Sequence, residues 1–429
     1  MKRTPGTDGL RGSLRVPGDK SISHRSVIFA SLADGVSNIR GFLDGEDCLR
    51  TVEVFRNMGV QIDRDGTTLT IHGRGMKGLK EPEVPLYFGN SGTTARLMSG
   101  VLAGLPFFTT AYGDDSLSRR PMDRVVVPLR EMGASIYGRE EAKKLPLAFD
   151  ASGLKGMTYE LPVKSAQVKS AVLLGGLLAE GTTTVIEKGR TRNHTETLLP
   201  EFGVDIRQKG LEVSIEGEQP LKASDINVPG DISSAAFFLV AAAITKGSDI
   251  TIEQVGLNET RNGIVQALEK MGAEISYTVT EYIGKEPVGD VSVRYSNLKG
   301  ATFEGEIIAN VIDEIPILAL AATQAEGQTI IRDAKELKVK ETDRIQAVCD
   351  NLRAMGAEIT PTEDGMIIEG GTPLHGAEVS SEGDHRIGMM EAIASLITSG
   401  DVVIHLPEAI NISYPSFFSD LDQLLEKKS

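Results

Sequence analysis

The organisation of the chain follows from one stretch, Val16-Pro17-Gly18-Asp19-Lys20-Ser21-Ile22-Ser23-His24-Arg25. Its Pro-Gly turn ends a short apolar strand, and an apolar helix begins just after it. Asp and Ser at this point can cap the helix, and the first backbone N–H groups then face whatever lies in front. Two cations and two hydroxyls at this helix start predict a site for a phosphorylated anion, although the stretch alone also fits a capped surface helix with solvated charges.

A two-helix pattern recurs along the whole chain. Its second helix ends at a glycine in Met58-Gly59-Val60, Met132-Gly133-Ala134, Phe202-Gly203-Val204, Met271-Gly272-Ala273 and Met355-Gly356-Ala357. Each glycine stands where a helix C-cap needs positive φ, and the next apolar residue starts a strand. The first helices are expected at 21–32, 91–103, 165–179, 233–244, 315–325 and 386–397, and a last helix at 417–426. These repeats predict six βαβαββ-type units.

A second symmetry divides the six units into three and three. Val228-Pro229-Gly230-Asp231, before a Ser-rich helix, repeats the Val-Pro-Gly-Asp of residues 16–19. We therefore expect an α/β protein of two similar domains, each with three repeats. The first domain would comprise residues 1–18 and 229–429, and the second residues 19–228. Ligands commonly bind in the cleft of such a pair.

Composition restricts the class of protein. At 429 residues with 40% hydrophobic content the chain can bury more than one core, and its net charge of −15 argues against nucleic acid or an acidic membrane surface as a partner. The longest apolar run, residues 235–244, is too short to span a bilayer. No apolar signal region opens the chain, and two distant cysteines fit reduced thiols, so we expect a cytoplasmic protein. As a separate expectation, the protein is a monomer.

Two sequence patterns that suggest nucleotide binding lack their structural context. Residues 73–78 match the dinucleotide-binding glycine pattern, but they lead into Pro82 and Pro85 and not into a helix. Gly18-Asp19-Lys20-Ser21 resembles the end of a phosphate-binding P-loop, but the Gly-Lys-Ser order is interrupted. The six histidines show no metal-ligand spacing. We therefore expect neither a cofactor nor a metal.

Clusters of cations and hydroxyls recur at the expected helix starts. Cations at a helix N-terminus oppose the helix dipole, and an anionic ligand would remove that conflict. Any one cluster alone is more simply a solvated helix end, but their equivalent positions in the repeats favour a binding site. They are residues 90–96, 118–124, 165–169, 190–195, 258–261, 338–344 and 384–386.

Carboxylates are embedded among these cations. Asp313 opens an apolar helix, and Glu341 lies between Lys340 and Arg344 in sequence. A carboxylate among cations stays ionised and can act as a base, while a less solvated neighbour can hold a proton as an acid. Both are also ordinary helix-start residues, so a structural role is the alternative.

Taken together, these motifs resemble the 5-enolpyruvylshikimate-3-phosphate (EPSP) synthase family over essentially the whole chain. The motifs are residues 18–25, 89–93, 119–122, 165–169, 340–344 and 383–386. The resemblance implies two three-unit domains, the inverse αβ barrel. It also implies transfer of an enolpyruvyl group from phosphoenolpyruvate to the 5-hydroxyl of shikimate 3-phosphate, with release of phosphate, in aromatic amino-acid biosynthesis.

The resemblance also assigns site residues. For phosphoenolpyruvate it implies Lys20, Gly92, Arg120, Gln167, Arg344 and Arg386. For shikimate 3-phosphate it implies Lys20, Ser21, Arg25, Ser165, Gln167, Asp313 and Lys340, with Arg192 a further candidate for the phosphate. Asp313 would take the hydroxyl proton and Glu341 would deliver one to C3, with Lys20 able to share these roles.

One departure from the family bears on its glyphosate-type inhibitors. Enterobacterial and plant members carry a Lys two residues before an aromatic-Pro pair, where this chain has Ile412 before Tyr414-Pro415. Two alternative functions stay open. The sister enzyme that transfers enolpyruvate to a UDP-sugar uses a loop cysteine as acid, but Cys48 and Cys349 are expected in helices. The other is a non-catalytic anion-binding protein on the same scaffold.

Overall fold

The computed structural model describes residues 1–4, 6 and 8–425. These residues form two compact units, each with its own hydrophobic core. Unit 1 comprises Met1–Pro17, Pro229–Tyr282 and Glu286–Ser429, and unit 2 comprises Gly18–Val228 with Ile283–Lys285. The chain passes from one unit to the other at Pro17–Gly18 and at Val228–Pro229, within the two Val-Pro-Gly-Asp stretches, and the short segment Ile283–Lys285 between β16 and β17 is also grouped with unit 2.

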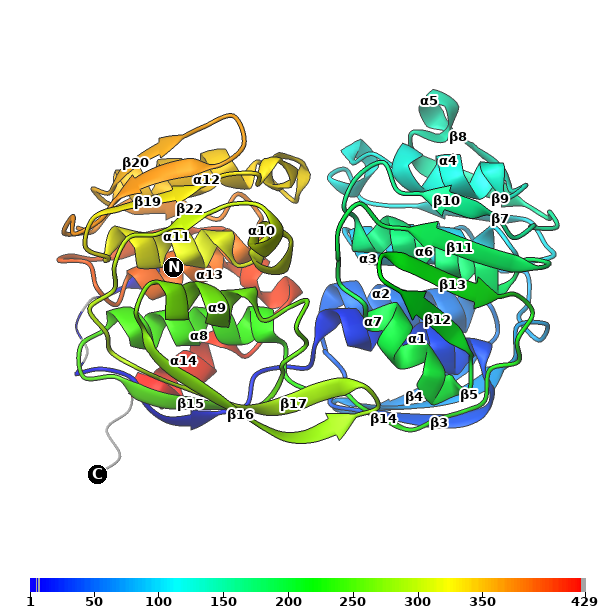
Figure 1. Cartoon of the computed structure of the whole chain (residues 1–429), viewed down its shortest axis with the longest axis horizontal. Helices are drawn as coiled ribbons and strands as arrows, with labels where there is room; N and C mark the ends of the chain where they lie inside the picture. The colour runs from blue at the N-terminus through cyan, green and yellow to red at the C-terminus, as the bar shows by residue number, and fades with distance from the viewer. Residues whose placement is uncertain (5, 7, 426–429) are drawn as a thin grey trace. The chain divides into compact units, whose positions relative to one another are not determined.

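Unit 2 repeats one α/β arrangement three times (Figure 1). Each sheet has a parallel pair extended by two antiparallel strands, in the orders β14-β3-β5-β4, β6-β7-β9-β8 and β10-β11-β13-β12. The strands are β3 (Asp34–Arg40), β4 (Gln61–Asp65), β5 (Thr68–Arg74), β6 (Leu86–Tyr87), β7 (Thr109–Tyr112), β8 (Ser135–Gly138), β9 (Lys144–Asp150), β10 (Thr158–Glu160), β11 (Thr182–Ile186), β12 (Ile206–Lys209), β13 (Glu212–Glu216) and β14 (Ile226–Asn227). The helices are α1 (Lys20–Leu32), α2 (Glu46–Asn57), α3 (Gly92–Leu102), η1 (Leu117–Arg119), α4 (Asp123–Glu131), α5 (Arg139–Ala142), α6 (Ala166–Leu177), α7 (His194–Leu198) and η2 (Leu199–Phe202).

Unit 1 follows the same plan with sheets β16-β17-β15-β2, β18-β19-β21-β20 and a shorter β1-β23-β22. The strands are β1 (Lys2–Arg3), β2 (Arg11–Leu14), β15 (Asp249–Gly256), β16 (Glu274–Ile283), β17 (Glu286–Arg294), β18 (Thr302–Phe303), β19 (Gln328–Ile331), β20 (Glu358–Pro361), β21 (Met366–Glu369), β22 (Glu378–Ser380) and β23 (Val402–His405). The helices are α8 (Ile232–Ile244), α9 (Gly263–Lys270), α10 (Glu306–Val311), α11 (Ile315–Thr323), η3 (Lys335–Val339), α12 (Arg344–Ala354), α13 (His385–Ala394), η4 (Pro407–Ile412) and α14 (Phe417–Leu425).

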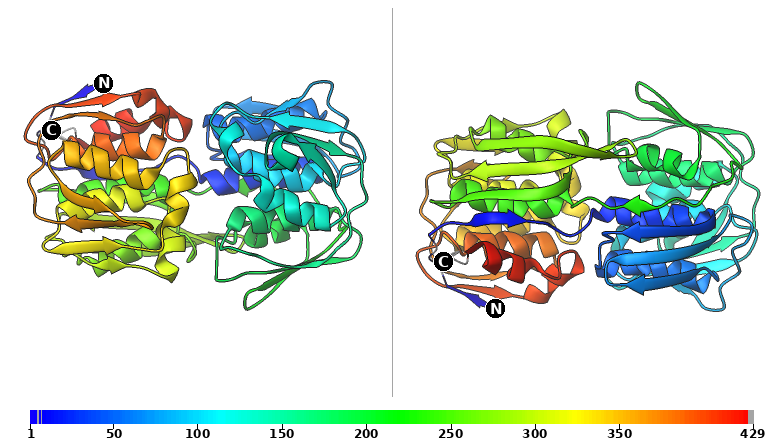
Figure 2. Two further views of the ribbon diagram at one scale, coloured as in Figure 1. Left: turned by 90° about the horizontal axis from the view of Figure 1, so that it is seen from above. Right: turned by 90° about the horizontal axis from the view of Figure 1, so that it is seen from below.

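The first helix of each repeat lies inside its unit, and the sheets cover it (Figure 2). In unit 1, α8, α11 and α13 pack against one another, and every residue of α8 and α11 is buried. A helix that is apolar on all sides is stable only in such an interior. These helices begin within one residue of the expected positions and end up to three residues earlier. The predicted end of the last helix, Glu426, lies outside the described residues.

The glycines that end the second helices adopt the predicted backbone conformation. Their φ angles are 83° at Gly59, 104° at Gly133, 79° at Gly203, 82° at Gly272 and 95° at Gly356. Positive φ is sterically cheap only for glycine, so these positions fix where each helix stops and its strand begins. The repeat pattern and the α/β class are therefore confirmed. No helix among residues 1–4, 6 and 8–425 is long and apolar enough to cross a membrane.

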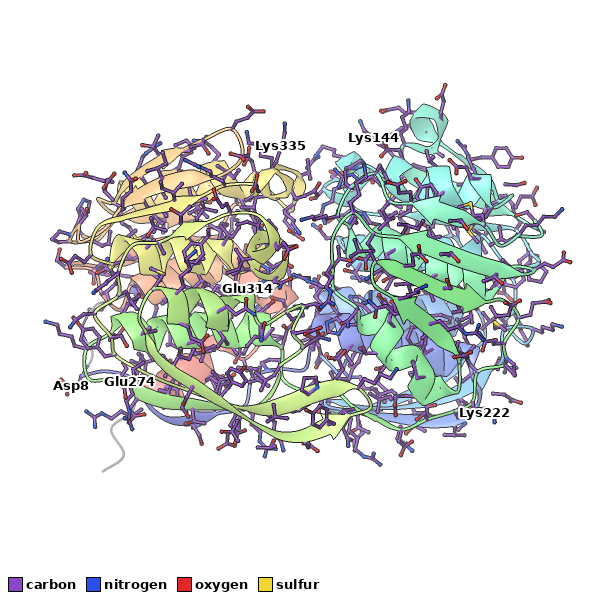
Figure 3. All side chains as sticks on the ribbon, viewed as in Figure 1. Asp8, Lys144, Lys222, Glu274, Glu314 and Lys335 are labelled. Carbon is purple, nitrogen blue, oxygen red and sulfur yellow. The ribbon has the colours of Figure 1, made fainter. Side chains whose placement is uncertain are left out.

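Close packing explains the glycine of the first Val-Pro-Gly-Asp stretch. A Cβ atom added at Gly18 would lie 1.9 Å from the backbone oxygen of Gly41. No side chain fits at that distance. Only glycine at position 18 therefore allows the backbone of this stretch to pack against the turn that follows β3. Among the charged residues, Lys222 and Glu274 are exposed on the surface, whereas Glu314 is buried (Figure 3).

Candidate functional site

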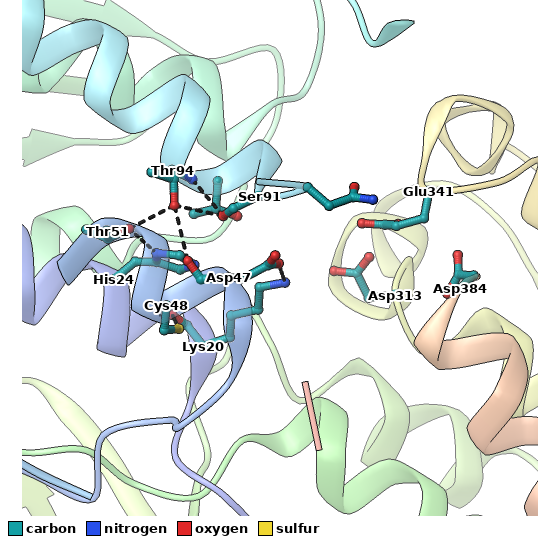
Figure 4. Close-up of polar contacts among 12 residues, drawn as sticks. Lys20, His24, Asp47, Cys48, Thr51, Ser91, Thr94, Asp313, Glu341 and Asp384 are labelled. Carbon is teal, nitrogen blue, oxygen red and sulfur yellow. Dashed lines mark hydrogen bonds and ion pairs between the residues drawn. The ribbon is translucent and has the colours of Figure 1, made fainter. Parts of the chain in front are cut away.

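Helix α1 begins as the sequence predicts, with a capped N-terminus and a cation in its first turn. The Asp19 side chain accepts a hydrogen bond from the backbone N–H of Ile22 at 2.9 Å. Lys20 is the first helical residue, and its Nζ forms an ion pair with Asp47 of α2 (Figure 4). The Lys20 side chain stays 20% exposed, whereas that of Asp47 is 9% exposed. Asp47 therefore orients the cation without removing it from solvent.

Arg25 lies deeper, one turn along α1. Its guanidinium donates to the Ser21 carbonyl at 3.0 Å, to Ser170 Oγ of α6 at 2.6 Å and to Thr195 Oγ1 of α7 at 2.8 Å. Arg25 is only 4% exposed. Its hydrogen bonds connect α1, α6 and α7. Its positive charge therefore lies in the interior, close to the backbone of Ser21.

Three further predicted residues gather at the start of α3. Gly92 is the first residue of this helix, and a Cβ there would lie 2.9 Å from Arg96 Nη1 and 3.2 Å from Arg120 Nη1. Arg96 donates to Gln167 Oε1 at 2.7 Å, and Arg120 donates to Asn90 Oδ1. Two guanidinium groups and an amide thus meet at a helix N-terminus, which suits an anion.

Ser165 and Arg192 complete the predicted set in unit 2. Ser165 caps α6 and accepts from the backbone N–H of Val168 at 3.4 Å, and it is partly exposed. Arg192 lies in the segment between β11 and α7 and is also partly exposed. Lys169 behaves differently: its side chain is fully buried in ion pairs, so it is not one of the exposed cations that we expected at this helix start.

A buried chain of hydroxyls lies behind Lys20 (Figure 4). His24 Nδ1 is 2.8 Å from Thr51 Oγ1, which is 2.8 Å from Thr94 Oγ1, and Thr94 contacts Ser91 Oγ at 2.8 Å. Burial first, and then the charges of Lys20 and Arg25, lower the pKa of His24 well below its usual value. His24 is therefore neutral and structural at pH 7.

In unit 1 the predicted residues centre on Arg344, at the start of α12. Its Nε donates to Asp384 Oδ2 at 2.7 Å, its Nη2 to Glu341 Oε2 at 2.6 Å and its Nη1 to Asp313 Oδ1 at 3.3 Å. Arg344 is 1% exposed. Burial disfavours its charge, but the carboxylates of Asp384, Glu341 and Asp313 outweigh burial and raise its pKa. One buried guanidinium therefore holds both acid–base candidates.

Lys340 and Arg386 stand beside this group. Lys340 Nζ lies 3.2 Å from Asp313 Oδ1, so Asp313 contacts two cations. Arg386 is the second residue of α13, and its Nη1 is 3.7 Å from Glu314 Oε1. The Arg386 side chain is 12% exposed and that of Glu314 is fully buried. Glu314 in turn accepts from the Ser233 hydroxyl of α8.

The residues that sequence reasoning missed are the anionic partners of the cations. Asp47, Glu314 and Asp384 are each fixed on a cation that had been singled out. Asp384 had a detectable signal, because it caps α13 and directly precedes His385-Arg386. Glu314 directly follows Asp313 at the expected start of an apolar helix, but nothing in the local sequence of Glu314 or Asp47 indicates which cation it meets.

The two cysteines bear on the UDP-sugar alternative. In the described ranges there is no group of three or more His, Cys, Asp and Glu residues that could hold a metal ion. Cys48 lies in α2 and Cys349 in α12, both buried, and burial raises the pKa of the Cys349 thiol to about 12. Neither is a loop acid of the kind that the UDP-sugar enzymes use. Ile412, at the position of the family lysine, ends η4 and is partly buried.

Comparison with known proteins gives one consistent result. The family model described as EPSP synthase (3-phosphoshikimate 1-carboxyvinyltransferase) matches residues 5–421. A 3-phosphoshikimate 1-carboxyvinyltransferase of Oceanobacillus iheyensis is 56% identical over 98% of both chains, and one of Streptococcus thermophilus is 55% identical over 99% of this chain and all of the other.

Solved structures agree with the sequence relatives. An EPSP synthase from Acinetobacter baumannii superimposes with a TM-score of 0.89 at 46% identity, covering 99% of this chain and 97% of the other. The enolpyruvyl transferase NikO from Streptomyces tendae has a TM-score of 0.79 at 19% identity, covering 99% and 96%, which shows a shared fold. The chain is a transferase of this fold, and it belongs to the EPSP synthase (3-phosphoshikimate 1-carboxyvinyltransferase) family.

Proposed function

We propose that this chain transfers the enolpyruvyl group of phosphoenolpyruvate to the 5-hydroxyl of shikimate 3-phosphate. The products are 5-enolpyruvylshikimate 3-phosphate and inorganic phosphate, in the pathway to chorismate and the aromatic amino acids. The observation that carries the proposal is the group around Arg344. Asp313 and Glu341 lie 3.3 and 2.6 Å from a guanidinium that is almost fully buried. Two fixed carboxylates suit a reaction that moves one proton off a hydroxyl and another onto carbon.

The chemistry requires an addition followed by an elimination. Asp313 takes the proton of the 5-hydroxyl while the oxygen of that hydroxyl bonds to C2 of phosphoenolpyruvate. Glu341, which must enter the reaction protonated, gives its proton to C3, with Lys20 able to share these transfers, and a tetrahedral adduct results. In the elimination Glu341 takes a proton back from the new methyl group, and phosphate leaves C2 with the proton that Asp313 held, which restores the double bond. Atoms and charge balance without an oxidant, a metal or a cofactor.

Cations of unit 2 support binding of both anions. The proposed ligands of shikimate 3-phosphate in this unit are Lys20, Ser21, Arg25, Ser165 and Gln167. Arg192 would contact the phosphate group of the same substrate. Arg25 anchors this set, because its donors fix α1, α6 and α7 together. Phosphoenolpyruvate would contact Lys20, Gly92, Arg120 and Gln167, where two guanidinium groups approach the N-terminus of α3. Preorganised cations also stabilise the charge that develops on departing phosphate.

Residues of unit 1 are also proposed ligands of the two substrates. Asp313 and Lys340, which are 3.2 Å apart, would bind shikimate 3-phosphate. Arg344 and Arg386 would bind phosphoenolpyruvate. Arg344 then has two roles, because its nitrogens also hold Asp313, Glu341 and Asp384.

We further propose a cytoplasmic monomer whose partners are small anions and which binds neither nucleic acid nor membrane. The net charge of −15 repels polyanions and acidic lipid surfaces. Cys48 and Cys349 are buried thiols in separate units, which suits a reducing compartment. Light scattering after gel filtration should give a mass near 46.0 kDa. A dimer mass would contradict the monomer.

Phosphate release tests the proposed function. The protein is mixed with phosphoenolpyruvate and shikimate 3-phosphate together, with each alone, and with phosphoenolpyruvate and a UDP-sugar. We expect rapid release only with the first pair. Release with the UDP-sugar instead would indicate the sister activity, and binding of both anions without release would indicate a non-catalytic protein.

A further inference from the structure

Unit 2 contains a buried group of three charged side chains, Lys169, Glu187 and Glu196, next to residues just assigned to shikimate 3-phosphate. Lys169 Nζ is 3.1 Å from Glu187 Oε1 and 2.6 Å from Glu196 Oε1. The three side chains are 0%, 1% and 5% exposed. Both contacts are ion pairs by distance, although their angles fall outside hydrogen-bond geometry. Taking three charges out of water is costly, so an apolar residue would serve simple packing better at Lys169.

The two carboxylates stand at the two ends of one segment. Glu187 directly follows β11, and Glu196 lies in the first turn of α7. The segment between them carries Arg192, the candidate for the phosphate of shikimate 3-phosphate. The Thr191 hydroxyl donates to Glu187, which ties the middle of the segment to the same group. Lys169 therefore bridges the base of the segment that presents Arg192.

The same group is continuous with the other proposed phosphate ligands. Lys169 lies on α6, which Ser165 caps and whose first turn carries Gln167. The next residue, Ser170, accepts from Arg25 Nη2 at 2.6 Å and lies 2.8 Å from Thr195 Oγ1. Thr195, beside Glu196, accepts from Arg25 Nε at 2.8 Å. A shift of the segment at Glu196 would thus also displace Arg25.

We propose that Lys169 is a positioning residue for the phosphate subsite of shikimate 3-phosphate. By pairing with Glu187 and Glu196 it sets the segment that carries Arg192 against α1 and α6. It also neutralises part of a buried negative charge, since two carboxylates face one ammonium. Without it those carboxylates would repel each other, and the phosphate of the substrate. This inference rests on the proposed function for the identity of the substrate.

The test compares Lys169→Met, which removes the charge and keeps the length of the side chain, with Lys169→Arg, which keeps the charge. Because a displacement of about 1 Å in a positioning group can cost roughly 100-fold, we expect Lys169→Met to raise the KM for shikimate 3-phosphate by roughly 10- to 100-fold. The KM for phosphoenolpyruvate should rise by a clearly smaller factor, since of its proposed ligands only Gln167 lies on α6 near Lys169, while Gly92 begins α3 and Arg120 ends η1. Lys169→Arg should recover most of the loss. The matched control is Lys222→Met, an exposed lysine of unit 2 (Figure 3) that should leave both KM values unchanged.

Glu196→Gln keeps the test decisive if Lys169→Met does not fold. It removes one ion pair and preserves shape, and it should raise the same KM severalfold. Equal rises in both KM values, or a lower Tm with both KM values unchanged in Lys169→Met and Glu196→Gln, would overturn the positioning role and leave a structural one. Wild-type protein that releases no phosphate would refute the proposed function and this inference with it. Wild-type turnover with an unchanged KM in the variants would refute the inference alone.

Discussion

Glu391 should make the protein less stable as pH rises. It lies in α13 and is fully buried, and neither of its carboxyl oxygens has a hydrogen-bond partner among the described residues. Burial first, and the nearby Glu382 charge second, raise the pKa of Glu391 from 4.5 to about 9. Between these two values the folded state holds a proton that the unfolded state has released. The free energy of unfolding therefore falls with increasing pH, and no loss is present below pH 4.5.

The magnitude follows from the size of the shift. One pKa unit corresponds to 1.36 kcal/mol, so this one group lowers the free energy of unfolding by about 3 kcal/mol at pH 7 and by about 6 kcal/mol at pH 9. Glu391→Met has a similar volume and no charge to bury. Its stability relative to the wild type should therefore grow by about 1.4 kcal/mol per pH unit across this window.

Urea unfolding of both proteins between pH 5 and pH 9 measures the difference. Glu269→Met, an exposed helical glutamate of the same unit, is the control and should show no such slope. A constant offset between Glu391→Met and wild type at every pH would refute the reasoning. It would mean that Glu391 has a polar partner or is exposed to water.

Three further predictions concern Arg344, the two carboxylates that it holds, and the neighbouring Arg386. Asp313→Ala and Glu341→Ala should each lower kcat by ~10²–10⁴-fold with smaller changes in KM, because each removes a proton-transfer group; near wild-type kcat in steady-state assays would exclude the assigned role. Arg344→Met should lower the free energy of unfolding by about 3–5 kcal/mol, since it leaves carboxylates buried without their cation; an unchanged urea midpoint would contradict this. Arg386→Ala should weaken phosphoenolpyruvate binding by about 2–5 kcal/mol in calorimetry, and unchanged affinity would remove Arg386 from the site.

The repeats could be predicted because their signals are local. A glycine after Met58 or Met271 ends a helix by its own φ angle, and the apolar helices are long enough to recognise from composition. The two-residue strand β1 had no such signal. It exists only because Lys2 and Arg3 pair with β23, almost at the other end of the chain.

Partners in the site could not be predicted, because sequence spacing says nothing about tertiary contacts. Asp384 lies 40 residues from Arg344 and meets two of its nitrogens. Lys169 follows the predicted binding residues on α6 and still points into the interior. Glu391 lies in an apolar run, where burial depends on the helices packed around it. The sequence shows which of these residues carry a charge. Only the fold determines which charged groups lie next to each other and which are buried.

The most direct test of the account follows the carbon of phosphoenolpyruvate. Substrate labelled with ¹³C at C2 is incubated with shikimate 3-phosphate and wild-type protein, and the products are observed by ¹³C and ³¹P magnetic resonance. The account predicts a labelled enol ether at the 5-oxygen of shikimate 3-phosphate and one inorganic phosphate for each ether formed. Labelled pyruvate in place of the ether, or no phosphate at all, would contradict it.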